Sequence, residues 1–262
     1  MGRQLPLFSE LRAPVWPALL LLATLSACGP ATLPSGATID DPYEAQNRAV
    51  HEFNRDVDRA LVRPAASSLG TAVPDPVLVG IGRMSSNLSH PSYVVNDVLQ
   101  LRLADAIHNT SRFVINSTIG ILGIFDPASA MGLDERETDF GETLHVWGVP
   151  EGSYVELPIF GPSTSRDTVG RVVDIALNPL RGLEPDAANT VRGINVTSRF
   201  GDRHRFGGTI DSILYESEDS YAQARLLYLQ NRRFELRGDA EPEYFDPYED
   251  PYDDLFFEPN GQ

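Results

Sequence analysis

Residues 41–64 read DPYEAQNRAVHEFNRDVDRALVRP. An aspartate at the N-cap, a proline at the first helical position and a glutamate soon after are typical of a helix start, so we expect a helix to begin at Asp41. Arg63-Pro64 is expected to end it, because a residue before proline disfavours helical geometry. Between these limits, apolar side chains recur at spacings of three and four and form one stripe. They are Val50, Phe53, Val57, Ala60 and Leu61.

The rest of the chain is also expected to be mainly helical. Further helices are predicted over residues 77–88, 92–100, 103–118, 166–177, 187–200, 209–215 and 221–236. Only residues 153–160 alternate like a strand, and Pro158 argues against one because proline cannot donate to a sheet. The sequence therefore predicts a mainly α protein with little or no β structure.

The N-terminal residues have the features of an exported lipoprotein. An apolar run over residues 15–25 follows two arginines and ends at Ser26-Ala27-Cys28, which is typical of a secretory signal. Cys28, the only cysteine, resembles the lipidated cysteine of the bacterial lipobox. A buried core cysteine is the alternative, but it would then lie at the edge of a removable segment. We expect a signal peptide over residues 1–27, lipidation at Cys28 and a flexible tether over residues 28–39.

Neither apolar segment of the chain is long enough to cross a bilayer as a helix, which takes about 20 residues. Residues 113–125 form the most apolar internal segment, and they include three polar side chains. We therefore expect a protein that is anchored to a membrane, or lies in it, without crossing it as a conventional helix. Gly120 and Gly123 interrupt this segment and are candidates for a bend. Composition alone favours an ordinary buried turn over a membrane-inserted hairpin.

Charge and motifs exclude several classes of function. The formal net charge is −16, which disfavours a nucleic-acid-binding protein. The five histidines lack metal-ligand spacing, residues 161–165 begin like a nucleophile elbow without its second glycine, and no phosphate-binding loop is present. We therefore expect no catalytic residue, metal or cofactor. Residues 239–262 hold nine carboxylates and six aromatics. They are predicted to be a disordered tail, either simply solvated or docking on a partner.

Several blocks of sequence occur in a definite order along the chain. They lie at residues 41–44, 47–48, 53–54, 62–64, 96–100, 112–120, 125–126, 138–144, 147–149, 157–158, 161–164, 166–167, 219–221 and 228–230. Together these blocks resemble the MlaA (VacJ) family of outer-membrane lipoproteins over about residues 40–237, and a helical domain is expected over residues 40–238. His145 departs from the resemblance, since the family usually has glycine there. The acidic tail lies outside the shared part.

The resemblance implies a ring-like arrangement of helices in the inner leaflet of the outer membrane. An amphipathic passage would let misplaced outer-leaflet phospholipid leave towards the periplasm, with a trimeric porin and a soluble periplasmic lipid carrier as partners and no enzymatic activity. Two alternatives stay open, a phospholipid-modifying hydrolase and a structural outer-membrane lipoprotein. Each candidate for the passage lining could equally be a core residue. The candidates are Arg48, Val50, Phe53, Asn54, Val57, Phe113 and Asn116.

Overall fold

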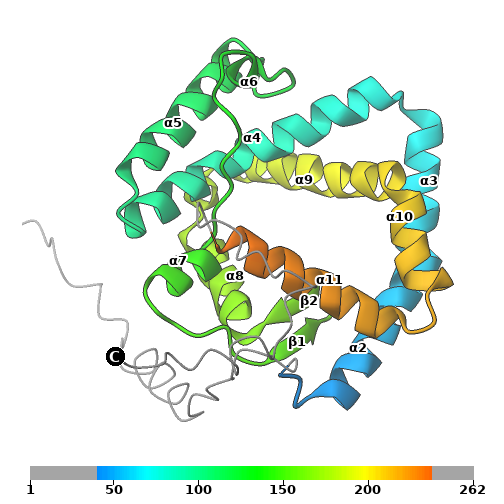
Figure 1. Ribbon diagram of the computed structural model, residues 1–262. Coiled ribbons are helices and arrows are strands. Elements are labelled where there is room, and N and C mark those ends of the chain that lie inside the picture. The colour runs from blue at the N-terminus through cyan, green and yellow to red at the C-terminus, as the bar shows by residue number, and fades with distance from the viewer. Residues whose placement is uncertain (1–39, 238–262) are drawn as a thin grey trace, which may run out of the picture. The chain divides into compact units, whose positions relative to one another are not determined.

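The computed structural model describes residues 40–237 (Figure 1). The chain divides into two units, residues 1–40 and 41–262, and the described fold belongs to the second. Cys28, the predicted signal peptide and tether, and the acidic tail lie outside the described residues. The elements are α2 (Glu44–Val57), η2 (Asp58–Val62), α3 (Arg63–Ala72), α4 (Asp75–Leu99), α5 (Leu103–Thr118), α6 (Pro127–Ala130), α7 (Phe140–Val146), β1 (Tyr154–Leu157), β2 (Gly161–Thr164), α8 (Ser165–Leu177), η3 (Pro179–Gly182), α9 (Pro185–Arg205), α10 (Gly207–Asp211), η4 (Ser212–Glu216) and α11 (Ser220–Glu235).

Packing contacts connect these elements into a closed circuit. α2 packs on β1, β1 pairs with β2, β2 contacts α8, and α8 contacts α4. α4 packs on α9, and α9 packs on α3, which leads back through η2 to α2 (Figure 1). α5 packs on α4 outside this circuit, while α11 contacts η4 and β2. The mainly helical, ring-like fold that the resemblance implied is therefore confirmed within residues 41–237.

The start and end predicted for the first helix were wrong. Asp41 does not cap the helix, since α2 begins at Glu44 without a side-chain cap, and the Asp41 carboxylate instead accepts hydrogen bonds from Asn47 and Tyr221. Pro64 does not end the helical path either. The turn before it widens into the π-helix η2, and Pro64 lies in the first turn of α3, where its missing N–H is tolerated.

Two predicted helices are a single one. α4 runs from Asp75 to Leu99 with Pro91 inside it, although the sequence predicted a break between residues 88 and 92. Packing against both α5 and α9 supports the whole length of α4, and such tertiary contacts outweigh the local cost of one proline. The prediction for residues 103–118 agrees with α5 at both ends.

The doubtful strand is real and has a partner that the sequence analysis missed. β1 and β2 pair antiparallel, with Leu157 opposite Gly161. Pro158 lies in the turn between the strands, so it removes no hydrogen bond from the pairing, and Gly161 has a positive φ of 75°. β2 was missed because Gly161 and Pro162 are poor strand residues on their own.

Candidate functional site

The described residues have an unusual distribution of polarity. Eight apolar side chains are buried, against twenty polar or charged ones. By contrast, twenty-nine large apolar residues are exposed. In water such a surface would be unfavourable, and extended apolar patches mark contact with lipid or another protein. No helix among residues 40–237 is both long and apolar enough to span a membrane.

Helix α5 shows this arrangement within a single element. Its inner face is formed by buried residues, including Asn109, Arg112 and Asn116. Its outer face carries Leu103 and Ile107, which are 61% and 69% exposed. The helix is thus amphipathic in the reverse sense from a soluble protein, with its polar stripe against α4 and its apolar stripe uncovered.

The apolar surface continues through the turn after α5. Ile121 and Leu122 are both more than half exposed and have positive φ angles of 54° and 58°. This conformation is unfavourable for any side chain and most of all for β-branched isoleucine. Asn87 of α4 holds the turn in place, because its Nδ2 donates to Ser117 Oγ at 2.9 Å and to the Leu122 carbonyl at 3.4 Å.

Both bend candidates lie in this turn. Gly120 and Gly123 are buried, and Gly123 has a φ of 93°. A Cβ on Gly123 would come within 2.4 Å of Asn87 Cβ, and one on Gly120 would come within 2.4 Å of the Phe125 carbonyl oxygen. The turn is therefore tight and buried at both glycines, while the apolar side chains between them are uncovered.

Gly123→Val is expected to lower the unfolding temperature more than Gly132→Val does. Both glycines have positive φ, which costs a valine about 1–3 kcal/mol. Only Gly123 also faces a clash, since nothing lies within 4 Å of a Cβ on Gly132. Thermal unfolding and helical content by circular dichroism would check this. Equal unfolding temperatures would show that contact with Asn87 does not matter.

A buried arginine fixes the segment that follows the turn. Arg112 is 2% exposed and donates to Asp126 Oδ2 at 3.2 Å, to Ser129 Oγ at 3.1 Å and to the Leu133 carbonyl. Asn116 Nδ2 donates to Asp126 Oδ1 at 2.8 Å. We call Arg112, Asn116 and Asp126 the α5 clasp. Burial would raise the pKa of Asp126, but hydrogen bonds from Ser129 and Asn116 outweigh it and lower the pKa from 3.8 to about 2.

The clasp should make stability depend on pH in acid. A carboxyl group whose pKa is lowered by folding stabilises the protein above its unfolded pKa, and this contribution is lost as the pH falls towards the folded pKa. We therefore expect the difference in unfolding temperature between wild type and Asp126→Asn to shrink as the pH is lowered from 4 to 2. A difference that stays constant over this range would contradict the assignment.

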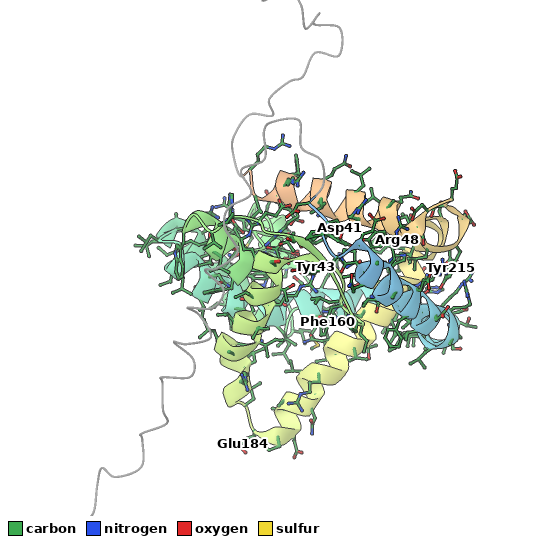
Figure 2. The ribbon with its side chains drawn as sticks, turned by 90° about the horizontal axis from the view of Figure 1, so that it is seen from below. Asp41, Tyr43, Arg48, Phe160, Glu184 and Tyr215 are labelled. Atoms are coloured by element: carbon green, nitrogen blue, oxygen red, sulfur yellow. The ribbon has the colours of Figure 1, made fainter. Side chains whose placement is uncertain are left out.

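Helix α2 has a polar inner face as well. Asn47 Oδ1 accepts from the Glu156 backbone N–H at 2.9 Å, and Asn54 Nδ2 donates to the Leu157 carbonyl at 2.9 Å. These two asparagines hold β1 against the helix. Arg48 forms ion pairs with Glu44 and Asp219 and lies 4.5 Å from the centre of the Tyr221 ring. Figure 2 shows Arg48 near Asp41 and Tyr43, at the start of α2.

The passage candidates divide into two groups. The group on α2 lies beside β1 and α11, whereas Phe113 and Asn116 lie on α5, on the opposite side of the described unit in Figure 1. On α2, Phe53 is 51% exposed, and Val50 and Val57 are half-buried. The structure thus brings the polar candidates into hydrogen bonds and leaves the apolar stripe partly uncovered.

A buried serine, histidine and glutamate lie together, which the sequence analysis did not find. His51 Nε2 is 3.0 Å from Ser220 Oγ, and His51 Nδ1 is 3.4 Å from Glu156 Oε1. All three residues are at most 7% exposed. This is the order of groups in a serine hydrolase, but such an enzyme also needs an accessible serine and N–H donors for the oxyanion. Residues 51, 156 and 220 are too far apart in the sequence for any local pattern to reveal them.

A third cluster joins η2, α9, α10 and η4. Arg203 donates from Nε and Nη2 to both carboxylate oxygens of Asp58 at 2.8 Å, and from Nη2 to Asp211 at 2.6 Å. Tyr215 also donates to Asp58, at 2.8 Å. Bidentate contacts of this kind fix the relative orientation of the two side chains. They therefore hold α9 and η2 together where the circuit closes. No group of three possible metal ligands was found among residues 40–237.

Comparisons with known proteins agree over most of the described chain. A sequence profile described as MlaA lipoprotein matches residues 39–235. An uncharacterised protein of Rickettsia typhi is 36% identical over 71% of this chain and 73% of its own length. The intermembrane phospholipid transport system lipoprotein MlaA of Escherichia coli is 32% identical over 76% of this chain and 79% of its own length. A solved structure concerning the structural basis for maintenance of bacterial outer membrane lipid asymmetry matches with a TM-score of 0.62 and 30% identity, covering 75% of this chain and 98% of that one.

Proposed function

This chain belongs to the MlaA lipoprotein family, and we propose that it removes misplaced phospholipid from the outer leaflet of the outer membrane. In this proposal it is part of an intermembrane phospholipid transport system that maintains lipid asymmetry. The phospholipid passes through the protein to the periplasmic side, where a soluble carrier takes it. The protein acts as a conduit and breaks no bond in the lipid.

The observation that carries the proposal is the reversed polarity of the fold. Exposed apolar side chains such as Ile107 and Leu122 suit an acyl-chain environment, where polar surface would be costly. Buried polar side chains hold the helices together by hydrogen bonds, so the fold does not depend on an apolar core. A closed circuit of helices can therefore remain intact while lying within one leaflet.

We place the passage within the circuit, beside α2. Phe53, Val50 and Val57 form a partly uncovered apolar stripe that would contact acyl chains. Arg48 and Asn54 support this wall, because Arg48 donates to Asp219 at the N-cap of α11 and Asn54 donates to β1. Phe113 and Asn116 act at a distance from α2, and Asn116 contributes by fixing the turn after α5 through the clasp.

The membrane anchor and the protein partners are also part of the proposal. Lipid chains on Cys28 would hold the protein at the membrane, and residues 28–39 would act as the tether. A trimeric porin would contact the protein in the membrane. The soluble lipid carrier, or a periplasmic part of its transporter, would bind the acidic tail over residues 239–262 through aromatic and charged side chains.

Cys28→Ala is expected to abolish lipidation and to leave the signal peptide uncut, so that the protein does not reach the outer membrane. Without the thiol there is no site for the acyl chains and no substrate for the lipoprotein peptidase. Membrane fractionation and mass spectrometry of the N-terminal peptide would check this. A Cys28→Ala protein that fractionates with the outer membrane and complements fully would rule out the anchor.

The hydrolase is the rival that has a specific observation in its favour, the His51–Ser220–Glu156 group. A hydrolase would convert phospholipid into lysolipid or free fatty acid, whereas a conduit leaves it intact. Lipid analysis after incubation of the purified protein with phospholipid separates the two, with Ser220→Ala as the matched variant. Intact lipid supports the conduit, and lysolipid that disappears in Ser220→Ala establishes the hydrolase. A purely structural lipoprotein would leave lipid distribution unchanged when the gene is lost.

A further inference from the structure

A pocket at the C-terminal end of α11 is separate from the α2 stripe. Its volume is about 600 Å³, and it lies between the end of α7, the following loop, the start of α8 and the end of α11. The lining residues are His145, Gly148, Val149, Pro150, Glu151, Arg166, Arg233, Leu236 and Arg237. Three arginines thus face one glutamate, in a chain whose net charge is strongly negative.

Arg166 is the buried member of this lining, and its hydrogen-bonding groups are poorly used. The residue is 4% exposed, and its Nε and Nη2 have no hydrogen-bond partner among the described residues. Its nearest carboxylate oxygen, Asp167 Oδ1, lies 3.5 Å from Nε. The Asp167 carboxylate is already engaged by Arg232 and Tyr228. A buried guanidinium with unused donors is costly, and an anion in the pocket would supply acceptors.

The surrounding residues fit an anion that also has an apolar part. His145 Nδ1 lies 3.4 Å from Arg166 Nη1 and must accept there, which leaves Nε2–H free to donate to a ligand. Glu151 is paired with Arg233 at 3.0 Å, so its charge is largely balanced. Val149 and Leu236 supply apolar contacts. Pockets of 300–1,000 Å³ accommodate small organic molecules, so this one has room for more than a bare phosphate ion.

We propose that this pocket binds the phosphate group of a glycerophospholipid head group, with Arg166, Arg237 and His145 as the donors. The inference rests on the proposed transport function and adds a head-group site to it.

The test measures binding of a short-chain phosphatidylglycerol to the full-length purified protein by phosphorus NMR and calorimetry. Arg166→Gln is expected to raise Kd about 10-fold or more, the effect of losing a charge-assisted hydrogen bond. Arg237→Gln and His145→Leu change more exposed groups and keep the test valid if Arg166→Gln fails to fold. Each is expected to raise Kd about threefold or more, because each removes a hydrogen bond that contributes less to binding than that of Arg166. Arg181→Gln is the matched control, because Arg181 is exposed and outside the pocket, and it should leave Kd unchanged.

Further arms identify the source of the anion. Inorganic phosphate is expected to bind much more weakly than the lipid. A peptide of residues 239–262 is expected not to displace the bound lipid. Phosphate that binds as tightly as the lipid, or complete displacement by the peptide, would overturn the head-group assignment. Unchanged Kd in Arg237→Gln and His145→Leu would remove the site itself. Lipid asymmetry restored in cells by these variants would then leave the transport function standing without this pocket.

Discussion

Arg112→Leu is expected to lower the free energy of unfolding by about 3 kcal/mol, because several acceptors lose a buried charged donor, although the Asp126 side chain is itself partly exposed. Arg112 is 2% exposed and donates to groups at four separate positions, His90, Asp126, Ser129 and Leu133. Leucine fills part of the space but leaves these acceptors without their donor. Unfolding of the detergent-solubilised protein, followed by circular dichroism, would measure the change.

The matched control for this prediction is Arg136→Leu. Arg136 also pairs with an aspartate, Asp105, but its side chain is 54% exposed. Exposed pairs contribute about 0–1 kcal/mol, so the control should be close to wild type. Similar losses in both variants would mean that the clasp has no special role in holding the segment after α5.

Ile107→Arg is expected to abolish lipid transport while leaving the unfolding temperature in detergent close to that of wild type. Ile107 is 69% exposed on the outer face of α5, so its replacement disturbs no buried contact. If that face lies among acyl chains, an arginine there costs about 2.5–3.5 kcal/mol or more. Complementation of cells that lack the gene, scored by surface-exposed phospholipid, would measure the loss.

Ile107→Ala separates the effect of charge from that of lost side-chain volume. Alanine removes apolar contact without bringing a charge into lipid, so this variant should complement nearly as well as wild type. Equal complementation by the alanine and arginine variants would contradict the assignment of the outer face of α5 to the membrane.

Periodicity in the sequence located most helices but could not show which face of each helix is buried. On α2, the stripe of Val50, Phe53 and Val57 was found correctly as one face. The face that packs against the protein is the polar one, with Asn47 and His51 buried. Spacing reveals that residues share a face, whereas the medium that the face meets depends on the rest of the fold.

The breaks in the chain were predicted less well, because proline acts through its surroundings. Pro64 was predicted to end a helix, yet a π-helical turn before it accommodates this proline. A break was predicted between residues 88 and 92, yet packing on two neighbouring helices supports one helix with Pro91 inside it. The buried clusters also could not be predicted from the sequence. Pairs such as Arg203 with Asp58 join residues that are 145 positions apart, and no local pattern encodes such contacts.

The central claim is that this protein removes phospholipid from the outer leaflet, and surface phospholipid in cells tests it most directly. Cells that lack the gene should expose phospholipid at their surface, and this sequence supplied in trans should return the level to that of wild type. Complementation by Ile107→Ala but not by Ile107→Arg should accompany this result. Surface phospholipid that is unchanged by loss of the gene, or that this sequence fails to reduce, would contradict the account.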